Sequence, residues 1–310
     1  MRVEEIDART ASDEVLLALE RHARACAPEL APGEPGRGDA EAIAFYRFQP
    51  TTHTSCYWLA EGGAAALYVH GPAAAFVHLF VDPPRRRAGI GTALLEAVVA
   101  RCRELGVTSL HGEHGSESGA AFAAHAGAKA GQRVVRSLLH LSGAVLPEPE
   151  APAGFRLETW TWRVPDEHLD AFVAVRRAMD DAPADEELEY PTATAEQVRA
   201  SEESLRLRER EPRLTVAIGG DGTIGAFTEL RVSRGATTAF TDDTGTLAEL
   251  RGRGLAKAVK LESLRRLVAD HPEVAVVTTS NAEENAAMRH VNALAGFRPT
   301  VTVTSATLAL

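Results

Sequence analysis

The pattern of apolar and polar positions repeats once along the 310-residue chain. Each half predicts a strand, an amphipathic helix, a hairpin and a strand that ends in a glycine turn. A helix, a buried strand, a short helix and a closing strand follow. The strands expected in the first half are Val3–Ile6, Tyr57–Ala60, Ala65–Val69, Phe76–Val81, Val107–His111 and Arg133–Leu141. Those expected in the second half are Phe155–Trp162, Leu214–Ile218, Thr223–Val232, Phe240–Leu247, Val274–Thr279 and Thr300–Leu308.

These elements predict the fold class and the domain organisation. Hairpins supply antiparallel strands and a helical crossover supplies a parallel pair, so each half should form an α/β (α+β) fold with a mixed sheet. Residues 143–154 hold three prolines and no periodicity, which is typical of a linker. We therefore expect two tandem domains, at residues 1–145 and 155–310, joined by a linker at 146–154.

Two turns rich in arginine and glycine carry the most informative chemistry. The first is Arg86-Arg87-Ala88-Gly89-Ile90-Gly91 and the second is Arg251-Gly252-Arg253-Gly254-Leu255-Ala256, each between a strand and a helix. A helix start offers unpaired N–H groups and the positive end of the helix dipole. Glycines let these N–H groups converge on an anion, and Arg86 and Arg251 can add paired donors. The pattern predicts a pyrophosphate ligand.

Two other phosphate-binding motifs are excluded at these turns. Neither turn has the Gly-x-x-x-x-Gly-Lys-(Ser/Thr) spacing of a P-loop. The dinucleotide fingerprint needs a third glycine where Leu94 stands. Both turns instead resemble the acyl-CoA-binding motif of the GNAT N-acetyltransferase superfamily. The resemblance covers nearly the whole chain as two tandem domains, an arrangement similar to that of mycothiol synthase.

The resemblance implies a cofactor and the residues that bind it. Loop N–H groups would bind the pyrophosphate of acetyl-CoA (CoA), and the preceding strand would pair with the pantetheine arm and polarise the thioester carbonyl. The expected contacts in the first half are Phe80, Val81, Arg86, Arg87, Ala88, Gly89, Ile90, Gly91 and Thr92. Those in the second half are Thr246, Leu247, Arg251, Gly252, Arg253, Gly254, Leu255, Ala256, Asn281 and Asn285. Asn281 also suits a helix cap.

The second half shows further similarity to a bacterial tandem subgroup. The matching positions are Met179–Pro183, Thr228–Leu230, Asp243-Thr244 and 281–292. Both halves depart from the superfamily at the tyrosine that many GNAT enzymes use to protonate the leaving thiolate. Ala123 and Asn292 stand at this position. Because neither is a competent acid, proton delivery would fall to water or to another side chain.

Three residues are candidate bases for acetyl transfer to an amine. Glu229 lies on the strand before the second motif strand, where its carboxylate can take a proton through water. Its alternative is an exposed position that alternates with Leu230. Asp242 and Asp243 adjoin in a strand and should point to opposite faces, with Asp243 the better candidate for the cleft. His78 lies mid-strand, and an imidazole can in general exchange a proton near neutral pH, although a partly buried histidine bonded to backbone is the alternative interpretation.

Composition limits the partners and the compartment. The 33 basic and 43 acidic residues give a net charge of −10, which disfavours nucleic acid and favours a cationic small molecule. The acidic run of Asp180, Asp181, Asp185, Glu186, Glu187 and Glu189 can gather such an acceptor, or can form a solvated loop. The three cysteines are too few for a disulfide framework or a metal cluster. No stretch resembles a signal peptide or a membrane span, so a cytoplasmic protein is expected.

The sequence therefore predicts a tandem-GNAT N-acetyltransferase that moves acetyl from acetyl-CoA to a primary amine of a small molecule. Direct attack is expected rather than an acyl-enzyme, because no cysteine lies in a turn or beside a candidate base. Catalysis is expected in the second domain. The alternatives are catalysis in the first domain, whose glycine loop is equally intact, and a CoA-binding sensor or scaffold. The acceptor and the oligomeric state do not follow from the sequence.

Overall fold

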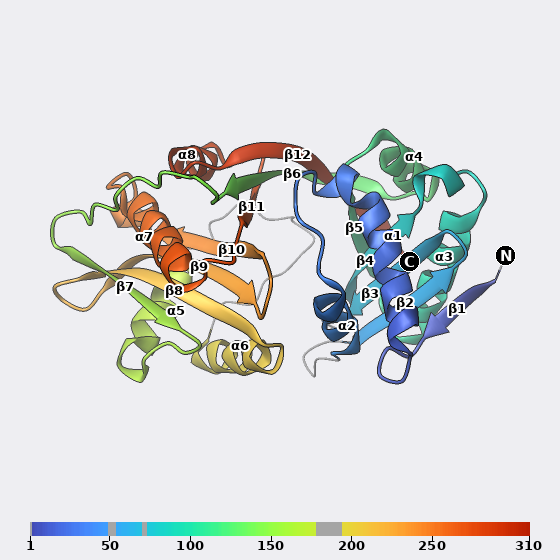
Figure 1. Cartoon of the computed structure of the whole chain (residues 1–310), viewed down its shortest axis with the longest axis horizontal. Helices are drawn as coiled ribbons and strands as arrows, with labels where there is room; N and C mark the ends of the chain where they lie inside the picture. The colour runs from blue at the N-terminus through green and yellow to red at the C-terminus, as the bar shows by residue number, and fades with distance from the viewer. Residues whose placement is uncertain (1, 49–53, 70–72, 178–193) are drawn as a thin grey trace. The chain divides into compact units, whose positions relative to one another are not determined.

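The computed structural model describes residues 2–48, 54–69, 73–177 and 194–310 (Figure 1). The chain divides into two compact units. Unit 1 contains Met1–Val135 and Val301–Leu310, and unit 2 contains Arg136–Thr300. The two units repeat one order of helices and strands. Each contains antiparallel and parallel strand pairs, which confirms the predicted α/β fold with a mixed sheet.

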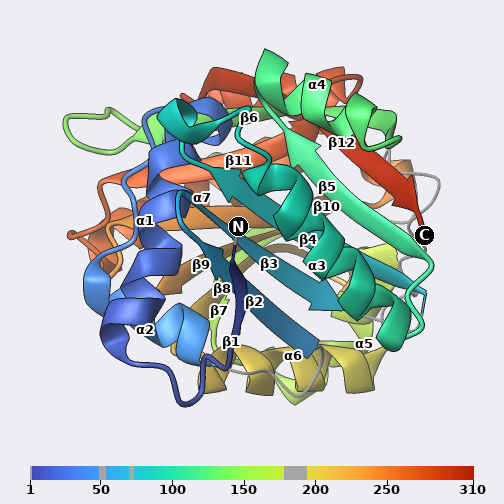
Figure 2. The same ribbon diagram turned by 90° about the vertical axis from the view of Figure 1, so that its right-hand side faces the viewer.

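Unit 1 builds its sheet in the order β1-β2-β3-β4-β5-β12. Its strands are β1 (Val3–Ile6), β2 (Thr54–Ala60), β3 (Gly63–Val69), β4 (Ala74–Val81), β5 (Ser109–His114) and part of β12 (Arg298–Ala309). Its helices are α1 (Asp13–Leu30), α2 (Asp39–Arg47), α3 (Ile90–Glu104) and α4 (Glu117–His125). Alternate residues of β2 enter opposite layers: Trp58 packs with α3, and Tyr57 packs with α1 and α2. Figure 2 shows α3 across the strands.

Unit 2 repeats this plan in the order β7-β8-β9-β10-β11-β6. Its strands are β7 (Phe155–Thr161), β8 (Arg210–Gly219), β9 (Ile224–Ser233), β10 (Thr238–Thr246), β11 (Val276–Ala282) and part of β6 (Lys129–His140). Its helices are α5 (Leu169–Arg176), α6 (Ala195–Leu207), α7 (Leu255–Asp270) and α8 (Ala286–Leu294). Leu261 and Leu264 of α7 pack with Leu230 of β9. Phe172 of α5 packs with Phe227, also of β9, so helices cover both faces of this sheet.

Both predicted closing strands are present, but each joins the sheet built by the other half of the sequence. β12 runs antiparallel to β5 in unit 1, with Thr304 opposite His114 and Leu308 opposite Leu110. In unit 2, β6 takes the place beside β11 and contributes Leu139 to the core. The expectation that each strand closes its own half is wrong, because periodicity reveals a strand without revealing its partner. The predicted boundaries at 145 and 155 stay predictions.

The helices α2 and α6 are not predicted from the sequence. α6 presents a narrow apolar stripe in which Val198 and Leu205 are buried, and most of its other residues are polar. Its start is nonetheless marked by a capping box, since the Thr194 side chain accepts from the Gln197 N–H and the Gln197 side chain accepts from the Thr194 N–H. A polar helix of this kind is held mainly by its contacts with neighbouring elements.

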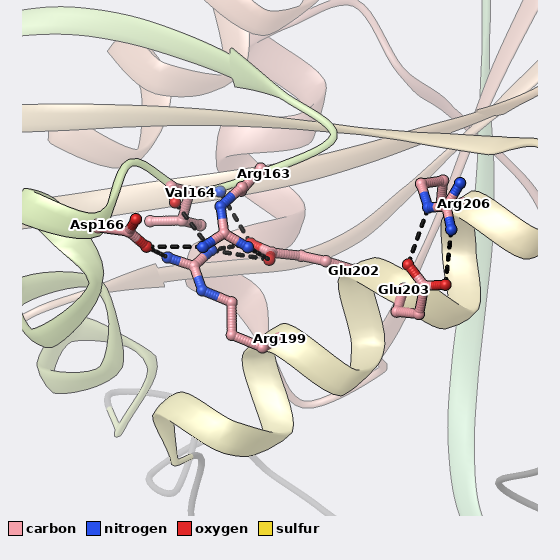
Figure 3. A network of polar contacts seen from close by, with 7 residues as sticks. All are labelled: Arg163, Val164, Asp166, Arg199, Glu202, Glu203 and Arg206. Carbon is pink, nitrogen blue, oxygen red and sulfur yellow. Dashed lines mark hydrogen bonds and ion pairs between the residues drawn. The ribbon is translucent and has the colours of Figure 1, made fainter.

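An arginine network fixes α6 to the turn after β7 (Figure 3). Arg199 donates to the Val164 carbonyl (2.8 Å), to Asp166 (2.5 Å) and to both oxygens of Glu202 (2.9 and 2.8 Å). Glu202 also accepts from the Val164 N–H at 2.8 Å. The buried partners of Arg199 would lose their hydrogen bonds without it.

Replacing Arg199 with methionine is expected to destabilise the protein by about 1–2 kcal/mol, because the Val164 carbonyl and Glu202 lose a charged donor. The matched control is Arg206→Met on the same helix, whose guanidinium pairs with the exposed Glu203 (Figure 3). Exposed pairs contribute little, so this variant should show no measurable change. Urea unfolding measures both. Equal stability of the two variants would contradict the role given to Arg199.

Candidate active site

The two glycine turns adopt the same backbone conformation. Gly89 caps α3 with φ 80° and ψ 0°, and Gly254 caps α7 with φ 82° and ψ 4°. Two residues earlier in each turn, Arg87 has φ 65° and Gly252 has φ 78°. These left-handed conformations favour glycine. The turns lie 165 positions apart in the chain and are geometrically equivalent, so each presents a helix N-terminus that can receive an anion.

The first arginine of each turn braces the strand before it. Arg86 Nε donates to the Val81 carbonyl at 3.2 Å, and Arg251 Nε donates to the Thr246 carbonyl at 3.3 Å. Arg86 also donates to Glu29 at 2.8 Å, and this hydrogen bond lowers the pKa of the Glu29 carboxyl. Nε and Nη1 of Arg86 are thus occupied by the protein. Backbone N–H groups are therefore the better phosphate donors at the first turn.

In each unit the strand before the turn separates from its parallel neighbour. The register of β4 with β5 runs from Ala74 opposite Ser109 to Phe76 opposite His111. The register of β10 with β11 runs from Thr238 opposite Val276 to Phe240 opposite Thr278. Both registers cover three residue pairs and stop well before the turn. The remaining strand edges can pair with an extended ligand.

A cavity of about 580 Å³ opens at the first turn, within unit 1. The predicted cofactor residues that line it are Phe80, Val81, Arg86, Arg87, Gly89, Ile90, Gly91 and Thr92. Ala88 is not part of the lining. Glu113, His114 and Ser116 line its other side, and burial lowers the pKa of His114. The cavity has the size of a small-molecule site. The cofactor role of these residues stays a prediction.

His78 lies outside the lining of this cavity. Its ring is stacked on Phe80 with centroids 6.0 Å apart, and it meets Tyr68 edge-on at 5.7 Å. It therefore belongs to an aromatic row on the face of β4 opposite α3. This environment explains the side chain structurally, and its catalytic role stays a prediction.

The three cysteines are buried and free. Burial raises the pKa of Cys26 and Cys56, and raises that of Cys102 to about 11. Thiols with raised pKa values stay protonated at neutral pH and are poor nucleophiles. This favours direct attack on the thioester.

The second turn leaves room for a ligand. A Cβ atom added at Gly252 or Gly254 would meet no heavy atom within 4 Å. Packing around the turn therefore does not require glycine here, whereas its left-handed backbone favours it. The helix N-terminus and the glycines of this turn suit an anion, and CoA binding at either turn stays a prediction.

A β-bulge in β10 gathers carboxylates beside the strand separation. The pairing of β10 with β9 shifts between Thr241 and Thr244, so Asp242 and Asp243 stand together opposite Glu229. The expectation that Asp242 and Asp243 point to opposite faces is wrong, because a bulge interrupts the alternation of a regular strand. Bulges are common next to active sites, where they redirect side chains.

Two arginines hold this carboxylate cluster together. Glu229 accepts from Arg231 at 2.9 and 3.1 Å and from Arg176 at 3.3 Å. Arg176 also donates to Asp243 at 2.8 Å, and Arg231 pairs with Asp242 at 2.5 Å. The Glu229 side chain is 8% exposed, whereas that of Asp243 is 37% exposed. Glu229 is thus enclosed, and the cluster opens to solvent at Asp243.

Burial makes the two aspartates more basic. It raises the pKa of Asp242 to about 6 and also raises the pKa of Asp243, while Arg231 and Arg176, respectively, act in the opposite direction. Carboxylates with raised pKa values are suited to accept a proton near neutral pH. The interpretation of Glu229 as an exposed residue is wrong, since its side chain is buried and carries three hydrogen bonds.

The two asparagines near α8 have different roles. Asn285 caps the helix, because its Oδ1 accepts from the Met288 N–H at 3.1 Å. The cap suggested for Asn281 is therefore wrong. Asn281 Oδ1 instead accepts from Asn292 Nδ2 at 2.5 Å, and Asn292 Oδ1 accepts from Lys260 Nζ at 2.5 Å. Whether either asparagine contacts the pantetheine arm stays a prediction.

Comparison with known proteins identifies the family. Residues 16–127 match the acetyltransferase (GNAT) family. The chain is 30% identical over 289 residues to a mycothiol acetyltransferase of Saccharomonospora viridis, covering 85% of this chain and 84% of that protein. The chain belongs to the GNAT acetyltransferase family. It is accordingly an N-acetyltransferase with the tandem GNAT architecture.

Further relatives agree with this assignment. A mycothiol acetyltransferase of Clavibacter sepedonicus is 30% identical over 224 residues, covering 68% of this chain and 66% of that protein. A tandem GNAT protein from the clavulanic acid biosynthesis pathway has a TM-score of 0.79 at 27% identity, covering 99% and 98% of the two chains. A GCN5-related N-acetyltransferase from Sphaerobacter thermophilus, at 18% identity and TM-score 0.76, shares the fold.

Several residues of the candidate site in unit 2 were not predicted from the sequence. Arg176, Arg231 and Lys260 belong to the polar network of unit 2, and no local motif marks them. Lys260 is a charged residue in the middle of α7, where every residue from Ala258 to Leu264 is buried. Met179–Pro183 and the acidic run between Asp180 and Glu189 lie outside the described residues. Among the described residues, no helix is long and apolar enough to span a bilayer.

Proposed function

We propose that this N-acetyltransferase moves acetyl from acetyl-CoA to a primary amine of a small molecule, and that unit 2 catalyses the transfer. The observation that carries the proposal is the carboxylate cluster at the bulge of β10, the strand that leads into the second glycine turn. The relatives at 30% identity are mycothiol acetyltransferases, which supports a small-molecule acceptor.

The cofactor would lie along β10 and at the second turn. When bound, acetyl-CoA supplies an acetyl group activated as a thioester. The N–H groups at Gly252, Gly254 and Leu255 would hold its pyrophosphate at the start of α7. The edge of β10 beyond Phe240 would pair with its pantetheine arm. These contacts would place the thioester of the cofactor near the point where β10 separates from β11.

The carboxylate cluster would bind and deprotonate the amine. An acceptor ammonium is attracted by Glu229, Asp242 and Asp243, whose charges are partly balanced by two arginines. Asp243 is the best placed base, because its side chain is the most exposed of the three and burial raises its pKa. Glu229 holds Arg176 and Arg231 in place and adds negative charge.

The test of the proposal is turnover of acetyl-CoA by the full chain with a panel of small primary amines. CoA release and the mass of the acetylated product are measured together. At least one amine should raise CoA release well above hydrolysis and gain one acetyl group. If neither small amines nor peptides do so, the proposal fails.

The cavity at the first turn favours a second candidate function, binding of CoA by unit 1. Its lining joins the predicted cofactor residues of the first turn with Glu113 and His114. His114 offers an imidazole there, although a carboxylate cluster like that of unit 2 is not found at this position among the described residues. Equilibrium binding of CoA should therefore give two sites for each chain, and a single site would argue against this candidate.

A further inference from the structure

A buried lysine leads a chain of hydrogen bonds across unit 2. Lys260 is 1% exposed and donates to Asn292 Oδ1 at 2.5 Å. Asn292, 3% exposed, donates in turn from Nδ2 to Asn281 Oδ1 at 2.5 Å. Lys260 also lies over the Phe297 ring, whose centroid is 5.3 Å from Nζ. Three elements, α7, α8 and β11, each contribute one residue to this chain.

The lysine fixes the direction of both amides. An amide can rotate to exchange its oxygen and nitrogen, and the surrounding hydrogen-bond donors and acceptors decide between the two orientations. An ammonium group only donates, so Asn292 must turn its oxygen toward Lys260 and its nitrogen toward Asn281. Asn281 must then accept with its oxygen, which leaves its Nδ2 as a donor to whatever lies beyond it. Through Asn292, the buried charge of Lys260 thus determines which way the amide of Asn281 is oriented.

The strand register shows what lies beyond Asn281. Asn281 stands three residues past Thr278, the last residue of β11 paired with β10. In unit 1, His114 stands three residues past His111, the last residue of β5 paired with β4. His114 lines the cavity at the first glycine turn. Asn281 therefore occupies the position in unit 2 that faces the cofactor cavity in unit 1.

Unit 1 has no counterpart of this chain of hydrogen bonds. Leu95 stands six residues after Gly89, as Lys260 stands six residues after Gly254. Ala123 is the seventh residue of α4, as Asn292 is the seventh residue of α8. The three polar positions of unit 2 thus correspond to leucine, alanine and histidine in unit 1. General packing of the fold does not require the lysine, because the equivalent unit replaces it with an apolar residue.

We propose that Lys260 and Asn292 position the side-chain amide of Asn281 so that its Nδ2 donates a hydrogen bond to the thioester end of acetyl-CoA in unit 2. This inference rests on the proposed function. Asn281 keeps its protons throughout: its N–H group stabilises the charge left on sulfur when the amine nitrogen displaces it. Asp243 would take the proton that the ammonium loses before attack. The amine nitrogen would then bond to the thioester carbonyl carbon as the C–S bond breaks, and the second proton lost by nitrogen would pass through water to the thiolate. Asn281 is thus a catalytic residue, and Lys260 and Asn292 are positioning residues.

The chemistry of the lysine supports this arrangement. Burial alone lowers the pKa of Lys260 to about 7, so a substantial fraction of it is charged near neutral pH. Hydrogen bonds in a chain polarise one another, and a cation at one end strengthens the donor at the other. Burying an ammonium group lowers the stability of the fold, so stability alone does not explain a lysine at position 260.

Steady-state kinetics of three variants test the proposal. Asn281→Ala removes the donor and should lower kcat about 100-fold. Lys260→Met leaves the amide orientation of Asn292 unfixed, and Asn292→Asp removes the N–H group that donates to Asn281, so each should lower kcat about 10-fold. KM for acetyl-CoA should change less than about two-fold, because the interaction strengthens in the transition state. The matched control is Leu95→Met in unit 1, with unchanged kinetics.

A second measurement needs no cofactor. The side-chain NH₂ signal of Asn281 in a ¹H–¹⁵N spectrum, assigned by its loss in Asn281→Ala, should shift with pH around the pKa of Lys260, about 7. Lys260→Met should abolish this shift. A signal that ignores pH in the wild-type protein, or that titrates alike in Lys260→Met, overturns the proposal even if a kinetic variant fails to fold.

The outcomes separate this inference from the proposed function. If Gly254→Trp loses turnover while Asn281→Ala and Lys260→Met keep wild-type kcat, unit 2 is catalytic and the role of Asn281 is wrong. If Gly254→Trp keeps full turnover, catalysis does not depend on unit 2 and the proposed function itself fails.

Discussion

Replacing Asp243 with asparagine is expected to lower kcat/KM for the amine about 100-fold, the usual loss when a general base is removed. Asparagine keeps the size of the side chain and its place beside Arg176, but cannot take up the proton. Glu229→Gln should also lower the rate, because Arg176 and Arg231 lose the carboxylate that they share. Amine-dependent CoA release measures both variants.

The pH dependence of the rate gives a sharper test of the base. A base acts when deprotonated, and burial raises the pKa of Asp243. The rate should therefore rise with pH through a limb above the ordinary aspartate value of about 4 and then level off. Glu229→Gln removes a neighbouring negative charge, which lowers the pKa of Asp243 and moves the limb to lower pH.

A matched control guards against a general loss of folding. Asp166→Asn also removes a carboxylate paired with arginine, at the network of Arg199 (Figure 3). This variant should keep its kinetics. An Asp243→Asn variant that retains the full rate and the acid limb would exclude Asp243 as the base.

The double variant Lys260→Met/Asn292→Leu is expected to unfold less readily than the wild type. A buried charge and its polar partner are replaced by apolar side chains of similar volume, a change that commonly stabilises by about 1–4 kcal/mol. Lys257→Met, at an exposed position of the same helix, is the control and should leave stability unchanged. The expected combination is a more stable but slower enzyme.

The stability gain should depend on pH with a definite sign. Burial lowers the pKa of Lys260 to about 7, well below the ordinary value of 10.5. Between these values the unfolded chain binds the proton and the folded chain does not, so wild-type stability rises with pH. The advantage of the double variant should be greatest below pH 7 and shrink as pH rises toward 10. Urea unfolding at pH 6 and 9 measures it, and a constant advantage would contradict the assignment.

Much of the fold follows from the sequence because its determinants are local. The strand Val3–Ile6 matches the structure, since the alternation of apolar and polar positions acts over a few residues. The glycines of the two turns likewise indicate the left-handed backbone that the structure has there. The partner of a strand is not local. β12 pairs with β5 although nearly 200 residues separate Thr304 from His114 in the chain, and no short pattern encodes this choice.

The same contrast between local and long-range determinants applies to the candidate site. The sequence singles out Glu229 on the strand before the motif strand and Asp243 within the motif strand, and in the structure both bind one arginine, Arg176. The bulge that turns both aspartates toward Glu229 was missed, because one extra residue in a strand leaves no clear signature. Lys260 was missed because an isolated lysine in a helix usually faces solvent. Its meaning depends on burial, which tertiary structure alone determines.

Turnover by a matched pair of glycine variants tests most directly whether unit 2 is the catalytic GNAT unit. Gly254 and Gly89 have nearly the same φ, 82° and 80°, so tryptophan imposes similar backbone strain at either position. The side chain would block the pyrophosphate cradle of the variant unit alone. We expect Gly254→Trp to lose at least about 100-fold in turnover and Gly89→Trp to lose far less while abolishing CoA binding in unit 1. Loss of turnover in Gly89→Trp alone would contradict catalysis by unit 2.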